Sequence, residues 1–374
     1  MTDRYDAIVL GVGEVGAATV AHLAERGTTV LGLERDDVPR GDGSAGTRRI
    51  RRAYEGDPAY VSLRRRADEL WTDLEAGHDR RLTYETGSIE AGPAGSDRLE
   101  RSRQACEEHG LEYESLSSAA LSDRYPGFQL PEAYEAIYQP DGGFLASQRC
   151  IVAHVERAHD AGATIRARER VVGWQSTGDG DVTVDTDHAR YEADNLVVTA
   201  GAWTAQFVDE LEGIVVPDRQ VLARLQPEVP ESFEPEAHPV WTLQVPEGLF
   251  YGFPVHDVPG FELGRCNRRE TADSPRAFER EPTQADERLL REFAEEHFPD
   301  GAGPTMGLQA RPSASTPDGD FVLDTLADHP QVAIGAGFSG HGATFATAIG
   351  EVLADLTLEG ETEHDIETFS LDRF

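Results

Sequence analysis

Three glycines near the start of the chain have the spacing of a dinucleotide-binding loop. Gly11, Gly13 and Gly16 follow an apolar stretch at residues 6–10 in the order G-x-G-x-x-G. The first glycine of such a loop permits a tight turn, the second lets the backbone approach a pyrophosphate, and the third lets helix and strand pack closely. Glu34 ends a second apolar stretch, where a carboxylate can accept a hydrogen bond from a ribose hydroxyl. The pattern predicts a site for FAD or NAD rather than NADP.

Arginines are concentrated soon after this unit. Residues 47–54 read Thr-Arg-Arg-Ile-Arg-Arg-Ala-Tyr, in a chain with 69 acidic residues and 34 lysines and arginines. A basic cluster in so acidic a chain favours binding of an anion. A solvated basic turn is the alternative.

Two further features suit negative charge. Residues 337–342 read Gly-Phe-Ser-Gly-His-Gly and precede a predicted helix, whose N-terminus carries free N–H groups and a partial positive charge. His341 either contacts a cofactor there or caps the turn. Arg311 has a guanidinium that can bind a carboxylate through two parallel hydrogen bonds, or it is a surface arginine at a strand end.

The predicted elements that must position these residues are those of an α/β protein. Buried strands are predicted at residues 6–10, 28–33, 195–203 and 331–336, and helices at 17–25, 57–75, 147–161, 204–211 and 343–357. Ser147 is the predicted N-cap of its helix. Short runs broken by Pro and Gly between residues 217 and 264 predict a mostly antiparallel sheet, whereas residues 111–140 are predicted to be irregular.

The composition excludes several classes of protein. The formal net charge is −35, which molar salt would screen, so we expect a halophilic protein of a high-salt cytoplasm. The acidic residues are dispersed, which disfavours nucleic-acid binding. All 34 basic residues are arginines, which excludes Schiff-base chemistry with pyridoxal phosphate and a Walker-type loop. Three scattered cysteines suit neither a disulfide framework nor a zinc site, and we expect no metal, no signal peptide and no membrane span.

Several segments together resemble one enzyme family. They are the glycine fingerprint, Gly46-Thr-Arg-Arg-Ile-Arg-Arg-Ala-Tyr54, Val197-Val-Thr-Ala-Gly-Ala-Trp203, Tyr251-Gly-Phe-Pro254 and Gly337-Phe-Ser-Gly-His-Gly342. In this order they are similar to the monomeric sarcosine oxidase and N-methyltryptophan oxidase family of FAD-dependent amine oxidoreductases, in the D-amino-acid oxidase superfamily.

The resemblance implies a Rossmann-type FAD domain, which we place at residues 1–80, 145–215 and 320–374. It also implies a substrate domain with a mostly antiparallel sheet, placed at residues 81–144 and 216–319. The implied chemistry is hydride transfer from the carbon beside an amine to flavin N5, followed by imine hydrolysis. We expect a small amino-acid or N-methylated substrate with a carboxylate, an unknown electron acceptor, and a monomeric protein.

The resemblance also implies site residues. Arg48 and Arg51 match an arginine pair, one near the flavin and one for a substrate carboxylate, and Tyr251 matches an active-site tyrosine or is an ordinary strand aromatic. The turn at His341 would face the negative charge of reduced flavin near N1. The remaining expected cofactor contacts are Gly11, Gly13, Glu14, Val15, Gly16, Glu34, Arg35, Ser44, Thr47, Val171, Ala200, Gly201, Trp203, Gly337, Phe338, Gly340, Gly342 and Thr344.

The sequence departs from the family at three positions. Residues 308–313 lack the cysteine that holds flavin covalently in the oxidases, so we expect non-covalent FAD. Glu262 stands where those oxidases have an oxygen-activating lysine, and Thr344 replaces a lysine that helps bind carboxylate. Arg311 resembles instead the carboxylate-binding arginine of glycine oxidase. A cation beside the flavin assists reduction of O₂, whereas the acid Glu262 would oppose it. Arg265 is near in sequence, but strand alternation puts it on the opposite face from Glu262, so it cannot replace the lysine. We therefore expect slow reduction of O₂.

Three alternatives stay open at this point. A flavin-dependent 2-hydroxy-acid dehydrogenase would use similar elements, an NAD-dependent dehydrogenase would use the same glycine fingerprint, and a non-catalytic flavoprotein would explain the missing lysines.

Overall fold

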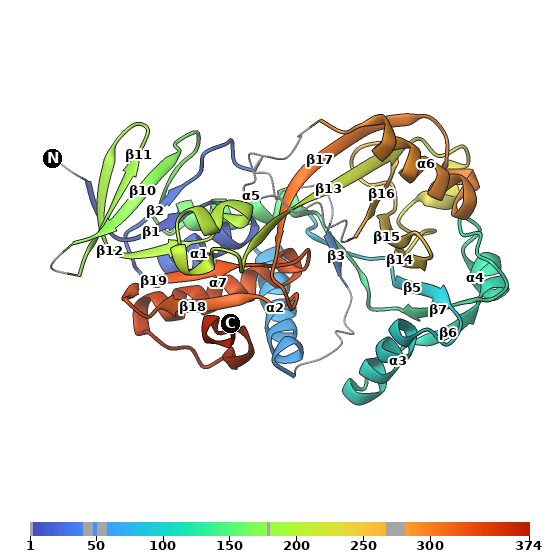
Figure 1. Cartoon of the computed structure of the whole chain (residues 1–374), viewed down its shortest axis with the longest axis horizontal. Coiled ribbons are helices and arrows are strands. Elements are labelled where there is room, and N and C mark those ends of the chain that lie inside the picture. The colour runs from blue at the N-terminus through green and yellow to red at the C-terminus, as the bar shows by residue number, and fades with distance from the viewer. Residues whose placement is uncertain (1–2, 40–47, 51–57, 178–179, 267–280) are drawn as a thin grey trace.

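The computed structural model describes residues 3–39, 48–50, 58–177, 180–266 and 281–374, and shows a mixed α/β fold with two large sheets. The sheets lie towards opposite ends of an elongated molecule (Figure 1). The expected fold class, a Rossmann-type part plus a mostly antiparallel part, is confirmed.

The first sheet has a parallel centre. Its parallel strands are β9 (Thr164–Arg166), β2 (Val30–Leu33), β1 (Asp3–Leu10), β12 (Arg190–Val198) and β19 (His329–Ala336). Three strands extend it in antiparallel pairing: β10 (Val171–Ser176), β11 (Val182–Thr186) and β18 (Val322–Leu326). The carboxyl ends of β1, β2 and β12 share one edge, where doubly wound sheets bind ligands.

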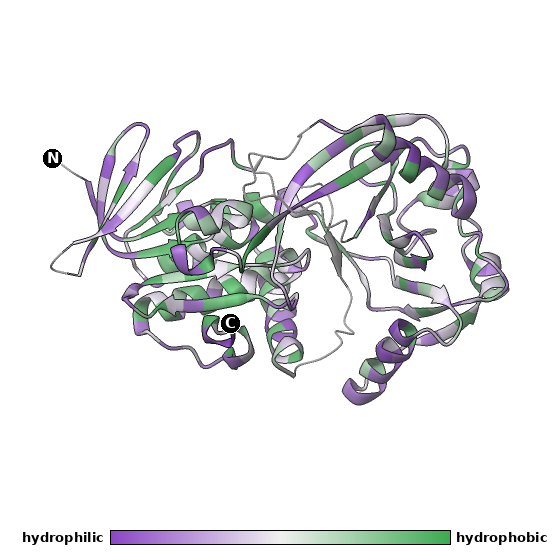
Figure 2. Ribbon diagram, viewed as in Figure 1, coloured by the Kyte–Doolittle hydropathy of each residue, from purple (hydrophilic) through white to green (hydrophobic). Residues whose placement is uncertain are grey.

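Four helices form a core with this sheet. They are α1 (Glu14–Glu25), α2 (Pro58–Ala76), α5 (Ser147–Asp160) and α7 (Gly342–Glu359). Helix α1 packs against α7 and α5, and its interface with α7 is so close that a Cβ on Gly350 would lie 2.7 Å from Cβ of Ala18. The central strands and helix α7 are strongly apolar, whereas helix α3 (Asp97–His109) is largely hydrophilic (Figure 2).

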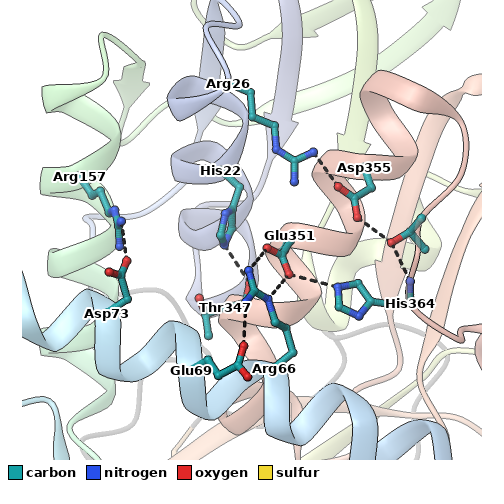
Figure 3. A network of polar contacts seen from close by, with 11 residues as sticks. His22, Arg26, Arg66, Glu69, Asp73, Arg157, Thr347, Glu351, Asp355 and His364 are labelled. Atoms are coloured by element: carbon teal, nitrogen blue, oxygen red, sulfur yellow. Dashed lines mark hydrogen bonds and ion pairs between the residues drawn. The ribbon is translucent and has the colours of Figure 1, made fainter.

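An ion-pair network ties three of these helices together (Figure 3). Glu351 of α7 accepts hydrogen bonds of 2.8 and 2.7 Å from Arg66 of α2, and lies 3.1 Å from Nε2 of His364. Arg26, the C-cap of α1, pairs with Asp355 of α7 at 2.7 Å. Burial alone would raise the pKa of Glu351, but the bonds from Arg66 and His364 outweigh it and hold that pKa well below its usual range.

The second sheet has eight strands and is antiparallel except for one parallel pair, β14 with β5. Its strands in spatial order are β17 (Thr305–Ser315), β13 (Val216–Leu225), β16 (Phe261–Arg265), β15 (Gly248–Phe253), β14 (Val240–Val245), β5 (Ser88–Pro93), β7 (Tyr134–Gln139) and β6 (Glu114–Ser117). Helices α3, α4 (Ser118–Arg124) and α6 (Gln284–His297) pack on it, and a small third sheet contains β3 (Arg48–Ile50), β8 (Gly143–Leu145) and β4 (Thr83–Glu85).

Three expectations about elements are wrong. Residues 111–140 are not irregular, because they contain β6, α4 and β7, which are ordered by pairing with β5. Residues 204–211 do not form an α-helix but lie in two short 3-10 helices, Gly201–Gln206 and Asp209–Leu211. The N-cap of α5 is Ala146, and the hydroxyl of Ser147 instead donates to the carboxylate of Glu14.

The described residues contain neither a candidate membrane span nor a candidate metal cluster. No helix there is both long and apolar enough to cross a membrane. The same residues contain no cluster of three or more His, Cys, Asp or Glu side chains placed to hold a metal ion.

Candidate active site

A cavity of about 540 Å³ is lined by residues of both large sheets. From the first sheet come the loop after β1, the end of β2 and the segment after β12. From the second sheet come strands β13, β15 and β17. The cavity therefore joins the predicted nucleotide-binding edge to the predicted substrate sheet.

The glycine loop has the shape that its spacing predicts. Gly11 has φ +94°, which favours glycine, and a Cβ on Gly16 would lie only 1.8 Å from the carbonyl oxygen of Gly11. A Cβ on Gly13 would meet nothing within 4 Å, and Gly13 lines the cavity. Gly13 is also the N-cap of α1, so the loop leaves open space where a helix N-terminus can bind a phosphate.

Glu34 is held by the backbone of this loop. It is buried, Oε2 accepts a 3.0 Å hydrogen bond from the N–H of Val12, and Oε1 accepts one of 3.0 Å from the N–H of Asp36. Burial raises the pKa of Glu34, although these two bonds act in the opposite direction. The carboxylate therefore has a structural role beside the expected contact with a ribose.

Most other expected cofactor contacts line the same cavity. Arg35 lies over the ring of Trp203, with Cζ 3.4 Å from the ring centroid. The lining also contains Glu14, Val15, Val171, Ala200 and Gly201.

The turn at residues 337–342 brings the N-terminus of α7 to the cavity. His341 is the N-cap of α7, and its carbonyl accepts a 2.9 Å hydrogen bond from Oγ1 of Thr344. The carbonyl of Thr344 accepts bonds from Arg64 (3.0 Å) and Trp71 (3.1 Å) of α2, which fixes this end of the helix. The expected contacts of this turn, Gly337, Phe338, Gly340, His341, Gly342 and Thr344, all line the cavity.

The second sheet contributes the expected tyrosine and arginine. Tyr251 of β15 and Arg311 of β17 line the cavity, and Nη2 of Arg311 donates a 2.7 Å hydrogen bond to Oε1 of Gln309. The structure thus brings two predicted substrate residues to the same space as the glycine loop.

The chain matches a known family along most of its length. Residues 6–356 match the model of the family described as FAD dependent oxidoreductase. The chain belongs to this family of FAD-dependent oxidoreductases.

Relatives match over essentially the whole chain. It is 36% identical to a monomeric sarcosine oxidase of a Bacillus species, covering 100% of this chain and 98% of the relative. It is 32% identical to the N-methyl-L-tryptophan oxidase of Citrobacter koseri, covering 99% of each chain. Among solved structures, the open form of NikD, an amino acid oxidase of nikkomycin biosynthesis, has a TM-score of 0.86 at 27% identity, covering 99% of this chain and 98% of that one.

The cavity fits the FAD of this family. The open space beside Gly13, the buried carboxylate of Glu34 and the N-termini of α1 and α7 are groups of the kind that can bind pyrophosphate, ribose and negative charge.

Glu262 lies elsewhere. It lines a second cavity of about 630 Å³ and accepts a 2.7 Å hydrogen bond from Nη2 of Arg224. The alternation expected for β16 agrees with the structure, because Arg265 is paired with Phe250 and its Cζ lies 5.9 Å from that ring. Arg224 was not expected here; it comes from the neighbouring strand β13 and compensates the charge of Glu262.

Four expected residues are not fully described. Ser44, Thr47 and Arg51 lie outside the described residues, and only the backbone of Arg48, in β3, is described.

Several lining residues were not expected. They include Arg98, Glu169, Arg170, Val172, Gln206, Gln220, Leu222, Leu249, Phe253, Cys266, Pro312 and Ser313. The alternation of apolar and polar residues along a strand shows which of its side chains lie on the same face of the sheet. Only the pairing of the strands shows which side chains of different strands line the same cavity.

Proposed function

We propose that this enzyme oxidises the C–N bond of an amino acid or N-methylated amino acid. The observation that carries the proposal is the single cavity in which the glycine loop meets Tyr251 and Arg311 of the second sheet. Relatives named as oxidases of sarcosine and N-methyl-L-tryptophan support this substrate class. FAD held in this cavity would supply the oxidant that takes a hydride from the carbon beside the amine, and water would then hydrolyse the imine.

The first sheet would hold the cofactor. Gly11 and Gly13 would receive the pyrophosphate at the N-terminus of α1, and Glu34 would accept a hydrogen bond from the ribose. The N-terminus of α7 at His341 would stabilise negative charge on the flavin ring. Because residues 308–313 contain no cysteine, we propose that FAD is bound without a covalent link.

The second sheet would hold the substrate. Arg311 would bind the substrate carboxylate, with Arg51 as a second candidate, and Tyr251 would line the space where the substrate lies. We propose accordingly that residues 1–80, 145–215 and 320–374 form the FAD domain, and that residues 81–144 and 216–319 form the substrate domain.

The pair of Glu262 and Arg224 bears on the electron acceptor. A carboxylate neutralised by a guanidinium at 2.7 Å offers no net positive charge to assist reduction of O₂. We propose that the enzyme reduces O₂ slowly and turns over faster with an artificial electron acceptor.

The test begins with purification in molar salt. Yellow protein should release its colour into the supernatant on acid precipitation, since a covalent flavin would stay with the pellet. The protein is then mixed anaerobically with sarcosine, other N-methylated and primary amino acids, and 2-hydroxy acids. Bleaching by the amines supports the proposal. Bleaching only by 2-hydroxy acids, or by nothing in the panel, would refute it.

A further inference from the structure

Gly264 occupies a position of the second sheet where the backbone does not require glycine. It is buried in β16 and pairs in regular antiparallel register with Leu222 of β13 and Tyr251 of β15. Its φ lies outside the left-handed region, so alanine could adopt the same backbone conformation. Glycine inside a regular strand weakens the strand and often marks a close approach of another group. The absence of a side chain at Gly264 therefore serves its neighbours rather than its own backbone.

Two side chains fill the space over Gly264. A Cβ on Gly264 would lie 2.9 Å from both Cζ and Oη of Tyr251, and 2.8 Å from Cδ2 of Leu222. Tyr251 and Leu222 both line the cavity of about 540 Å³. The phenol of Tyr251 thus leans from β15 across Gly264, and its hydroxyl lies over β16.

The ring of Tyr251 is supported on one side by its own strand. It meets Phe253 edge to face, with the ring centroids 6.0 Å apart and the planes at 86°. Phe253 is buried in a cluster with Phe144 and Val240, so it cannot easily give way. A methyl group on Gly264 would therefore push the phenol away from β16 and towards the cavity.

The direction in which Tyr251 leans brings its hydroxyl closer to Arg311. Residues opposite one another on paired strands share a face, and the row through Tyr251 continues over Gly264 and Leu222 to Gln309. Gln309 lies three inter-strand spacings from Tyr251, or about 14 Å, but only two from Gly264, or about 10 Å. Oε1 of Gln309 accepts the 2.7 Å hydrogen bond from Arg311. The phenol hydroxyl over β16 is thus about one strand nearer to Arg311 than the backbone of Tyr251 is.

We propose that Gly264 is a positioning residue for the substrate. Because it has no side chain, Tyr251 can lie across β16 with its hydroxyl on the side of Arg311, and the substrate lies between the two. This inference rests on the proposed function and adds a residue that acts on the substrate only through Tyr251.

The experiment compares Gly264→Ala with the natural protein and with Gly307→Ala, all loaded with FAD in molar salt. Gly307 belongs to the same sheet, its Cβ would meet nothing within 4 Å, and it does not line the cavity. The probe is methoxyacetate, which has the shape of sarcosine with an ether oxygen in place of the amine, and its binding is followed by the flavin absorbance. Gly264→Ala should raise the Kd of methoxyacetate and lower kcat/KM for sarcosine, each by about 10- to 100-fold. Gly307→Ala should leave both within about twofold.

A double-mutant cycle tests whether Gly264 acts through Tyr251. In a Tyr251→Ala background the phenol is absent, so adding Gly264→Ala should raise the Kd of methoxyacetate by less than about threefold. An equally large loss in both backgrounds would show that the methyl group disturbs the sheet itself, which would overturn the proposal. An unchanged Kd in Gly264→Ala alone would overturn it as well. Should Gly264→Ala alone fail to fold, the double variant should still fold and bind FAD, and failure of both would also overturn the proposal.

The binding measurement separates this inference from the proposed function. Coupling between residues 264 and 251 in the Kd of methoxyacetate supports the inference even if no amine is oxidised. Oxidation of sarcosine without such coupling would contradict the inference and leave the proposed function intact. A natural protein that binds no methoxyacetate would show that no ligand of this shape lies beside Tyr251, and the inference would fail.

Discussion

Replacing Gly16 or Gly13 of the same loop with alanine should have different effects. Gly16→Ala should lower the stability of the protein, whereas Gly13→Ala should lower its affinity for FAD. A Cβ on Gly16 would lie 1.8 Å from the carbonyl oxygen of Gly11 and 2.8 Å from Oγ1 of Thr199, so the loop must move. A Cβ on Gly13 would meet nothing within 4 Å, and the φ of −82° there suits alanine. The methyl at residue 13 would contact only what enters the cavity.

The magnitudes follow from these contacts. Overpacking by one methyl group costs about 1–3 kcal/mol. Gly16→Ala, with so close an overlap, should lower the free energy of unfolding of the flavin-free protein by about 3 kcal/mol. Gly13→Ala should change this free energy by less than about 1 kcal/mol, because two effects nearly cancel. Alanine is a poorer N-cap than glycine, which destabilises the folded protein. Alanine also makes the unfolded chain stiffer, which stabilises the folded protein by a similar amount. The same methyl beside the pyrophosphate should raise the Kd for FAD by about 10- to 100-fold.

The assay uses urea unfolding of the flavin-free variants and fluorescence titration with FAD, both in molar salt. Gly307→Ala is the matched control, because its Cβ would meet nothing within 4 Å and it does not line the cavity. If Gly13→Ala destabilises the flavin-free protein as much as Gly16→Ala, or binds FAD like the natural protein, the assignment of this loop is wrong.

Three further predictions concern charge. Lowering the salt concentration from molar to about 0.01 M lengthens the screening distance to roughly 30 Å. Repulsion among the charges that sum to −35 should then lower the melting temperature. A melting temperature that stays the same at every salt concentration would count against this. Glu262→Gln leaves the charge of Arg224 uncompensated and should raise the O₂ rate constant of pre-reduced enzyme roughly tenfold in stopped flow, whereas an unchanged rate would exclude this pair from the reaction. Asp286→Asn should cost about 3 kcal/mol at pH 7 because it removes the carboxylate that pairs with the buried guanidinium of Arg219 at 3.0 Å. Burial would raise the pKa of Asp286, but the bonds from Arg219 and Thr283 lower it to about 2, so urea unfolding should show this difference shrinking as pH falls from 3.8 towards 2.

The nucleotide-binding part of the fold could be predicted because its signals are local. The apolar strand before Gly11, the glycine spacing and the acid at Glu34 all lie within one β-α-β unit, and the structure has them in that order. The second role of Glu34 could not be predicted, because its bonds to the N–H groups of Val12 and Asp36 depend on the folded path of the loop.

The substrate side depends on strand order, which no local pattern contains. Arg98 is far in sequence from Tyr251, and only the pairing of β5 with β14 and of β14 with β15 brings them to one cavity. Arg224 was missed for the same reason, since its strand β13 pairs with β16 and so places it beside Glu262. Strands that pair although they are distant in sequence, β5 with β14 and β13 with β16, therefore account for both Arg98 and Arg224.

Exposed and buried charges of this chain should affect stability differently when the salt concentration is changed. Most of the described acidic residues are not buried, so mobile ions can screen them and their mutual repulsion depends on ionic strength. The pair of Arg219 and Asp286 is different, because the two side chains are only 6% and 3% exposed. Screening by salt acts weakly on such a buried pair, and the guanidinium cannot lose its proton when the carboxylate of Asp286 is removed. The loss of stability caused by Asp286→Asn should thus be the same in molar and in dilute salt. The total stability of the natural protein and of the variant should fall by equal amounts as the salt concentration is lowered. A loss that changed with salt as strongly as the total stability does would show that solvent ions reach this pair.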